Sequence, residues 1–137
     1  MNLYAWKLAI RIPTLPAATA PVLVGWGLAE RAHEFSLGPA LAALIGALLL
    51  QIGANFANDV FDFEKGVDTG SRLGPPRATQ LGLISPKSMK LGMSLTFALA
   101  LGAGIYLVSI AGWPIVLIGL ASIVAALVYT GGPWPIG

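Results

Sequence analysis

The 137-residue sequence contains no cysteine and only one histidine, and just 10% of its residues are charged. Without cysteine the chain can form neither disulfides nor thiolate metal sites, and one histidine excludes a multi-histidine zinc site within it. Soluble domains usually carry about 25% charged residues, so this chain has too few to cover a globular surface in water. Its eight basic residues are also too few for a phosphate-tracking surface, so we expect no nucleic-acid partner.

Apolar residues make up 56% of the sequence, and they gather in long uncharged runs. A helix needs about 20 consecutive apolar residues to cross a lipid bilayer. The runs therefore predict an all-α fold, a polytopic membrane helix bundle whose surrounding partner is the lipid bilayer. We expect four transmembrane helices, over about residues 10–30, 38–60, 88–110 and 114–130.

Proline and glycine mark the irregular points of these helices. Pro13, Pro16 and Pro21 predict a first helix with a distorted start. The prolines and the further spans favour a retained first helix over a cleaved signal peptide. The uncharged tract after Lys90 is too long for one span, and the sequence Ala-Gly-Trp-Pro at 111–114 predicts the break within it.

Basic residues are distributed unevenly among the connecting segments. The first loop contains Arg31, the turn near Gly112 contains none, and the N-terminal segment contains Lys7 and Arg11. The segment between the second and third helices has most of them: Lys65, Arg72, Arg77, Lys87 and Lys90. By the positive-inside rule, the N-terminus and this loop, over about residues 59–87, face the cytoplasm from the inner cell membrane.

All three aspartates of the chain, Asp59, Asp62 and Asp68, lie in one short stretch that also contains Asn55 and Asn58. If the second span continues as a helix, offsets of 3, 4 and 7 residues put both asparagines and the first two aspartates on one face. The third aspartate follows a predicted glycine C-cap and could fold back toward them. Carboxylates on adjacent turns repel each other, and a cation with a preference for oxygen ligands, Mg²⁺ first of all, would relieve that repulsion.

The basic residues that follow this cluster fit an anionic partner. Arginine can bind a phosphate bidentately, and Arg72 and Arg77 lie close behind the aspartates. The combination indicates a lipid-linked phosphate or diphosphate substrate at the membrane surface. Two other interpretations stay open at this point. One is an acidic helix end that leads into a solvated loop, and the other is a binding site for Ca²⁺ or a transported cation.

The stretch Asn58-Asp59-Val60-Phe61-Asp62, followed by Lys65-Gly66-Val67-Asp68, resembles the first aspartate-rich motif of the UbiA superfamily of intramembrane prenyltransferases. The likeness extends upstream to Gln51 and Asn55. It also covers residues 11–16, 72–77, 80–85 and 129–137. The late placement of the third aspartate, after Lys-Gly, is most similar to the 1,4-dihydroxy-2-naphthoate polyprenyltransferases of menaquinone biosynthesis.

This resemblance implies a Mg²⁺-dependent enzyme that transfers a polyprenyl group from an allylic diphosphate to 1,4-dihydroxy-2-naphthoate, an aromatic acceptor. The implied catalytic residues are Asp59, Asp62 and Asp68, which with Asn58 would also ligate the metal. The implied substrate-binding residues are Asn55, Asn58, Lys65, Arg72 and Arg77.

The sequence departs from the family pattern in its second half. The resemblance implies a roughly nine-helix bundle with a second aspartate-rich motif, whereas no aspartate follows Asp68. We therefore expect residues 1–137 to be the N-terminal part of such a domain. Alone it would be inactive, and a C-terminal half or a partner chain would complete it. The alternatives are a UbiA-type prenyltransferase with another acceptor and a non-catalytic four-helix membrane protein that binds a cation.

The charge distribution gives a test of orientation. Because the chain has no cysteine, Ser71→Cys and Glu34→Cys each introduce a single labelling site. A membrane-impermeant maleimide added to intact cells should label the Glu34→Cys variant and leave Ser71→Cys unlabelled, since the basic loop is expected in the cytoplasm. Labelling of Ser71→Cys with protection of Glu34→Cys would reverse the orientation.

Overall fold

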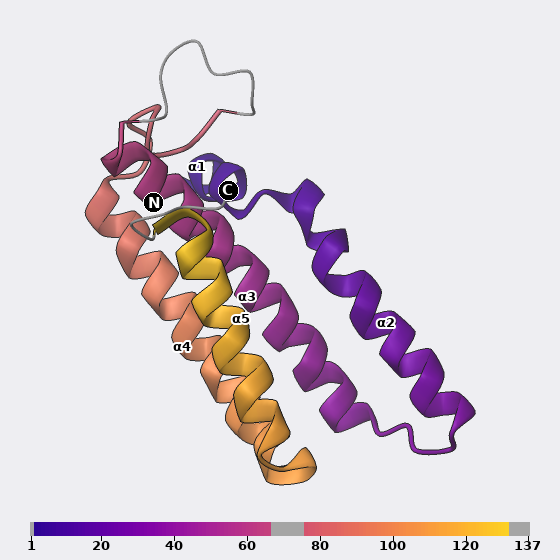
Figure 1. Cartoon of the computed structure of the whole chain (residues 1–137). Coiled ribbons are helices and arrows are strands. Elements are labelled where there is room, and N and C mark those ends of the chain that lie inside the picture. The colour runs from indigo at the N-terminus through magenta and orange to yellow at the C-terminus, as the bar shows by residue number, and fades with distance from the viewer. Residues whose placement is uncertain (1, 67–75, 132–137) are drawn as a thin grey trace.

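The computed structural model describes residues 2–66 and 76–131, and every regular element within these two ranges is helical. Four long helices form the body of the molecule (Figure 1): α2 (Leu15–Arg31), α3 (Leu37–Glu64), α4 (Pro86–Ala111) and α5 (Pro114–Gly131). A short helix, α1 (Leu3–Ile10), and a 3₁₀ turn, η1 (Ile12–Thr14), precede them. The expected all-α, four-helix bundle is confirmed, and α1 is an element that the sequence analysis missed.

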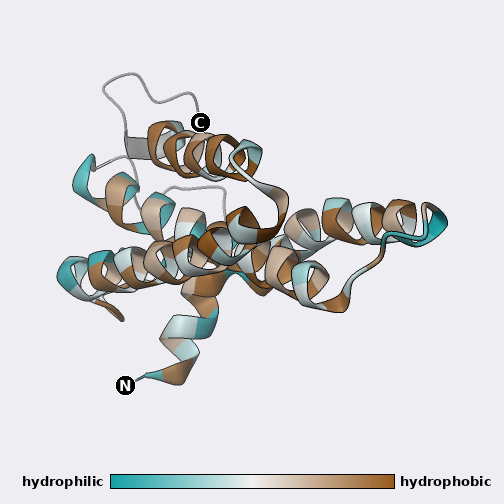
Figure 2. Ribbon diagram, turned by 90° about the horizontal axis from the view of Figure 1, so that it is seen from below, coloured by the Kyte–Doolittle hydropathy of each residue, from teal (hydrophilic) through white to brown (hydrophobic). Residues whose placement is uncertain are grey.

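The outside of the bundle is apolar along most of its length. Three stretches, Leu3–Arg31, Leu37–Glu64 and Pro86–Ala111, are long and apolar enough to cross a membrane, and Pro114–Tyr129 adds a shorter one. Hydrophobic residues predominate along the helices, and hydrophilic residues gather near the helix ends (Figure 2). Leucine, isoleucine and valine side chains exposed over such a surface are stable against lipid and unfavourable against water. The chain is a multi-pass membrane protein.

The predicted irregular start of the first span is a sharp break at Arg11, whose φ of 55° lies in the left-handed region. Pro13 follows in η1 and has no N–H to continue the α1 hydrogen bonds. In a continuous helix the Thr14 N–H would donate to the Ile10 carbonyl, but here it donates to the carbonyl of Arg11 at 2.8 Å. The break separates α1 from α2 and leaves the Ile10 carbonyl for another donor.

The other helix boundaries follow the sequence with one shift. Gly112, with a φ of 77°, makes the turn between α4 and α5, as the Gly-Pro pattern predicts. The loop expected over about 59–87 begins later, because α3 continues to Glu64. Ser85 starts α4 by accepting a hydrogen bond from the Ser88 N–H at 3.2 Å.

The most extensive helix packing joins α3 to α4, and glycines on α3 let the two backbones come close. A methyl group added at Gly53 would lie 2.7 Å from Phe97 Cε1, and one at Gly46 would lie 3.6 Å from the Ala103 Cβ. Gly53 therefore forms a notch that the Phe97 ring fills.

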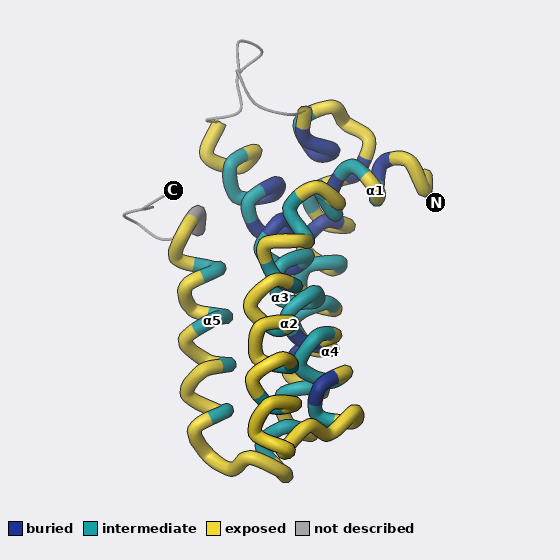
Figure 3. The backbone as a smooth tube through the Cα atoms, turned by 90° about the vertical axis from the view of Figure 1, so that its right-hand side faces the viewer, coloured by how far each residue is buried: buried dark blue, intermediate teal, exposed yellow. Residues whose placement is uncertain are grey.

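Most of the buried residues lie toward one end of the bundle (Figure 3). There α1, the C-terminal part of α3, the start of α4 and the segment before α4 meet. The cluster contains Ala5, Ala9, Phe56, Val60, Ala78, Ile84 and Met89. This end also carries the aspartates of α3, so the polar residues of interest lie against the best-packed part of the described structure.

The Gly53 notch gives a stability prediction. Gly53→Ala should lower the free energy of unfolding by about 1–3 kcal/mol, because the new methyl group forces Phe97 or the helix backbone to move. Gly102→Ala is the matched control on α4, where a methyl group meets nothing within 4 Å. It should be neutral or stabilise by up to about 1 kcal/mol through helix propensity. Thermal unfolding in detergent measures both, and equal behaviour of the two variants would contradict close packing at Gly53.

Candidate functional site

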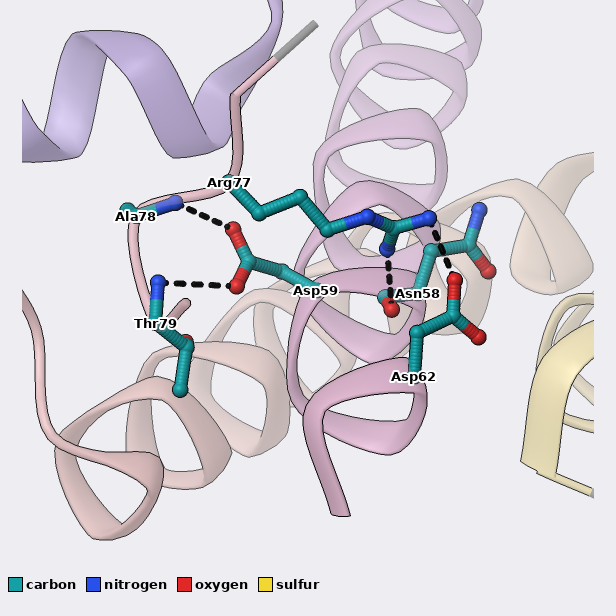
Figure 4. Close-up of polar contacts among 6 residues, drawn as sticks. All are labelled: Asn58, Asp59, Asp62, Arg77, Ala78 and Thr79. Atoms are coloured by element: carbon teal, nitrogen blue, oxygen red, sulfur yellow. Dashed lines mark hydrogen bonds and ion pairs between the residues drawn. The ribbon is translucent and has the colours of Figure 1, made fainter. Parts of the chain in front are cut away.

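The predicted polar cluster lies on the last turns of α3, and the segment 77–84 folds back over it (Figure 4). Ala78 and Ile84 of this segment pack into the same buried cluster as Val60 of α3 and Met89 of α4. Apolar contacts therefore hold the segment against the helix, and polar contacts set its register.

Asp59 is the most enclosed of the aspartates on α3, with 2% of its surface exposed. Its two carboxylate oxygens accept hydrogen bonds from the backbone N–H groups of Ala78 and Thr79, each at 3.0 Å (Figure 4). These N–H groups open a helix-like turn in which the Leu81 N–H donates to the Arg77 carbonyl at 3.0 Å. The first N–H groups of such a turn have no acceptor within the turn. The Asp59 carboxylate is their acceptor.

Arg77 reaches from the same turn to the helix. Its guanidinium forms an ion pair with the Asp62 carboxylate and donates to the backbone carbonyl of Asn58 (Figure 4). The Arg77 side chain is 5% exposed and that of Asp62 is 14% exposed. A planar guanidinium can serve two acceptors at fixed angles, which a lysine ammonium cannot do as well. The turn that Asp59 caps is thus the segment that brings Arg77 to Asp62.

Asn55 has a different set of partners. Its amide nitrogen donates to the Ile10 carbonyl at 2.8 Å and to Thr14 Oγ1 at 2.9 Å. Gln51 donates to the same Thr14 hydroxyl at 3.3 Å. Asn55 therefore donates to the Ile10 carbonyl, which has no backbone donor because the helix breaks between α1 and α2.

Both asparagines and both aspartates of this cluster lie on the last turns of α3, as the sequence predicts, but they contact different parts of the chain. Offsets of 3, 4 and 7 residues spread over about 100° of a helix, because successive residues turn by about 100°. Asn55 and Asp62 differ by only about 20° around the helix axis, but seven residues separate them by about 10 Å along it. The separation along the axis therefore gives these two residues different neighbours. The structure brings Asn58, Asp62 and Arg77 together, ties Asp59 to the backbone beside them, and places Asn55 at α1.

The remaining predicted residues lie at the edge of this site. Lys65 is exposed and caps the C-terminus of α3. Asp68 and Arg72 lie outside the described residues. Sequence reasoning missed Ala78 and Thr79, whose contribution is a backbone N–H that no side-chain pattern reveals.

The oxygen atoms of Asp62 and Asn58 are the kind of ligand that Mg²⁺ prefers. Asp62 offers a carboxylate and Asn58 a side-chain amide oxygen, both hard ligands. Mg²⁺ is commonly held by one or two carboxylates and completes its shell with substrate phosphates and water. Within residues 2–66 and 76–131 no three acidic or histidine side chains gather as a metal site. The residues present fit a metal shared with a phosphate-bearing ligand better than one enclosed by protein alone.

An apolar cavity of about 540 Å³ lies between α3, α4 and α5. Gly104 and Gly119 line it, and open space lies beside each of them. Among the described residues that line it, Ser122 alone has a polar side chain, and its hydroxyl donates to the Ile118 carbonyl at 2.8 Å. The lining therefore suits a hydrocarbon chain and offers little to a polar ligand.

The model of the UbiA prenyltransferase family matches residues 18–136. The chain is similar to proteins named 1,4-dihydroxy-2-naphthoate octaprenyltransferase: it is 40% identical to that of Escherichia coli over 97% of the chain, 37% identical to that of Mycobacterium tuberculosis over 96%, and 34% identical to that of Bacillus subtilis over 99%. These matches cover 45%, 45% and 43% of the relatives, so the chain spans about half their length. No solved structure matches the chain significantly.

The geometry around Asp59 predicts a structural effect of its substitution. Asp59→Asn should lower the free energy of unfolding by about 2 kcal/mol, because the amide N–H₂ would face a backbone N–H where a charged acceptor now stands. Thermal unfolding in detergent measures this loss.

The matched control is Glu64→Gln on the same helix. Glu64 pairs with Lys90 at 2.7 Å, but both side chains are more than two-fifths exposed. Its substitution should change the free energy of unfolding by less than about 0.5 kcal/mol. An Asp59→Asn variant as stable as Glu64→Gln would mean that the carboxylate does not hold the turn.

Proposed function

The chain belongs to the UbiA prenyltransferase family, and we propose that it forms the diphosphate-binding part of an enzyme that prenylates 1,4-dihydroxy-2-naphthoate in menaquinone biosynthesis. The observation that carries this proposal is the pairing of Asp62 with Arg77 beside Asn58 at the end of an apolar helix bundle. The Asp62 carboxylate and the Asn58 amide oxygen are suitable metal ligands. They lie next to the Arg77 guanidinium, which is a suitable phosphate ligand. The similarity to naphthoate prenyltransferases over nearly the whole chain supports the choice of acceptor.

The donor diphosphate would bind at the Arg77 guanidinium. Arg77 is held from two sides, by Asp62 and by the Asn58 carbonyl, so its orientation is set before a ligand arrives. Fixed donors stabilise charge that develops in a transition state more effectively than mobile ones, because they need no reorganisation. Lys65, which is exposed at the end of α3, and Arg72 would add positive charge near the same ligand.

Asp62 and Asn58 would hold Mg²⁺ together with the diphosphate oxygens, and Asp68 would add a carboxylate. The metal, when bound, would neutralise the charge of the departing diphosphate. Asp59 would be a positioning residue in this arrangement, since its two oxygens are bonded to the turn that carries Arg77. Asn55 would likewise fix α1 against α3 instead of touching substrate.

The isoprenoid chain of the donor would occupy the apolar cavity between α3, α4 and α5. Residues such as Gly104 and Gly119 leave room there, and the apolar lining suits a chain that has no polar groups.

The chain supplies only part of the proposed active site. It spans about half the length of the naphthoate prenyltransferases that it matches, and the second acidic motif implied by the family has no counterpart in its sequence. A C-terminal half, on the same polypeptide or on a partner, would provide the opposite wall. The basic loop supports an orientation in which this site opens to the cytoplasm from the inner membrane.

The proposal predicts which acidic residue of α3 is needed for catalysis. In a chimera that joins residues 1–137 to the C-terminal half of the Escherichia coli relative, Asp62→Asn should lower Mg²⁺-dependent turnover by about a hundredfold or more, because the metal loses its carboxylate. The assay measures prenylated naphthoate formed from a polyprenyl diphosphate, and thermal unfolding of each variant separates lost activity from lost folding.

Glu64→Gln is the matched control, since Glu64 lies two residues further along α3 and pairs with Lys90 outside the proposed site. It should keep the turnover of the unsubstituted chimera. Full turnover by a folded Asp62→Asn variant would contradict the role of Asp62. Product from 4-hydroxybenzoate but none from the naphthoate would assign the chain to another branch of the family.

A further inference from the structure

Helix α1 does not continue the direction of the spans but runs across the end of the bundle (Figures 1 and 3). One side of it is fixed to the protein. Ala5 and Ala9 are buried in the cluster at this end, and the Trp6 ring packs edge-to-face on Phe56 with centroids 5.5 Å apart. Trp6 also fills the space beside Gly92, where a methyl group would lie 2.9 Å from the indole ring. The orientation of α1 is therefore determined by packing on α3 and α4.

The opposite side of α1 is exposed and amphipathic. Leu3 is 66% exposed and Tyr4 67% exposed, and Lys7 is exposed one turn further on. Residues three and four apart lie on one face of a helix, so these three side chains form a single surface, the Leu3–Tyr4–Lys7 face. Ile12, just after the break, is another apolar side chain that is 55% exposed.

The depth of α1 in the bilayer follows from the residue of α3 that it contacts. The hydrogen bond from Asn55 to the Ile10 carbonyl fixes the end of α1 at the level of Asn55. Between the start of α3 at Leu37 and Asn55 the helix has about 19 residues, roughly 28 Å at 1.5 Å per residue. The hydrocarbon core of a bilayer is about 30 Å thick. The first charged residue of α3, Asp59, follows one turn later. This puts α1 at the boundary between hydrocarbon and headgroups.

The exposed face has the composition expected at that boundary. Tyrosine is enriched where an aromatic ring meets the headgroups, and a lysine can lay its methylene chain along apolar surface while its ammonium reaches the phosphates. The exposed ammonium of Lys7 favours an anionic headgroup.

We propose that α1 is an interfacial anchor whose Leu3–Tyr4–Lys7 face binds the headgroup region of the bilayer, with Lys7 on the phosphate of an anionic phospholipid. The bilayer then supports α1 from outside while Phe56 and the rest of the buried cluster support it from inside. The anchor fixes the depth of the α3 turns that carry Asn55 and Asp59. The proposal depends on the fold alone and holds whatever reaction the site performs.

The test uses spin labels in the chain reconstituted into liposomes. Because the chain has no cysteine, Leu3→Cys, Lys87→Cys and Leu99→Cys each give one labelled position. Lys87 is exposed on the first turn of α4 and serves as the aqueous reference. Leu99 is 53% exposed near the middle of α4 and serves as the hydrocarbon reference. Accessibility to oxygen and to a neutral, water-soluble nickel chelate gives the depth of each label.

The label at Leu3→Cys should lie between the two references, at headgroup depth, and Tyr4→Cys should repeat the result independently. In liposomes with anionic phosphatidylglycerol, Lys7→Gln should raise the ratio of water-exposed to lipid-bound α1 about fivefold, which is the contribution of one basic residue near such a surface. In liposomes of phosphatidylcholine alone the substitution should have no effect.

Three outcomes would overturn the proposal. A label at Leu3→Cys as accessible to nickel as that at Lys87→Cys would mean that α1 stands in water. A depth equal to that of Leu99→Cys would mean that α1 prolongs the α2 span. An effect of Lys7→Gln that is the same in neutral and anionic liposomes would mean that Lys7 does not bind an anionic phospholipid.

Discussion

The arrangement of the polar end of this bundle depends on one buried carboxylate, that of Asp59. Charge at a site shielded from solvent is costly unless hydrogen bonds satisfy it, and here two backbone N–H groups do so. The consequence reaches beyond the pair. The turn that these bonds hold supplies Ala78 to the apolar cluster and Arg77 to Asp62. Two carboxylates one turn apart thus avoid mutual repulsion by different means, one with backbone dipoles and the other with a guanidinium.

The same rule governs the first span, where an interrupted helix would expose backbone groups to lipid. Every polar group at membrane depth needs an internal partner, because lipid offers none. The Ile10 carbonyl, left over by the break at Arg11, receives the amide of Asn55, and Thr14 receives a second bond from the same amide. Polar residues that look catalytic in the sequence therefore divide into two groups: those that repair the backbone and those that face a ligand.

This division explains which parts of the fold and of the site could be predicted from the sequence. The uncharged runs predict four helices, and the Gly-Pro pattern predicts the turn at Gly112, because both depend on local chemistry. Helix α1 is hidden in the sequence, since its apolar residues merge with those of α2 and the left-handed residue between them is an arginine, not a glycine. The cluster on α3 is visible as a motif, but the partners of Asp59 are main-chain atoms some 20 residues away, which leave no side-chain pattern.

The separation along the chain between Asp59 and its partners has a consequence for biosynthesis. Ribosomes add roughly 5–20 residues per second, so Ala78 and Thr79 follow Asp59 by about 1–4 s. During that interval the carboxylate lacks the two backbone donors that it has in the folded protein. When the turn docks, the carboxylate exchanges water for the two N–H groups. Closure of the polar end therefore follows the synthesis of α3.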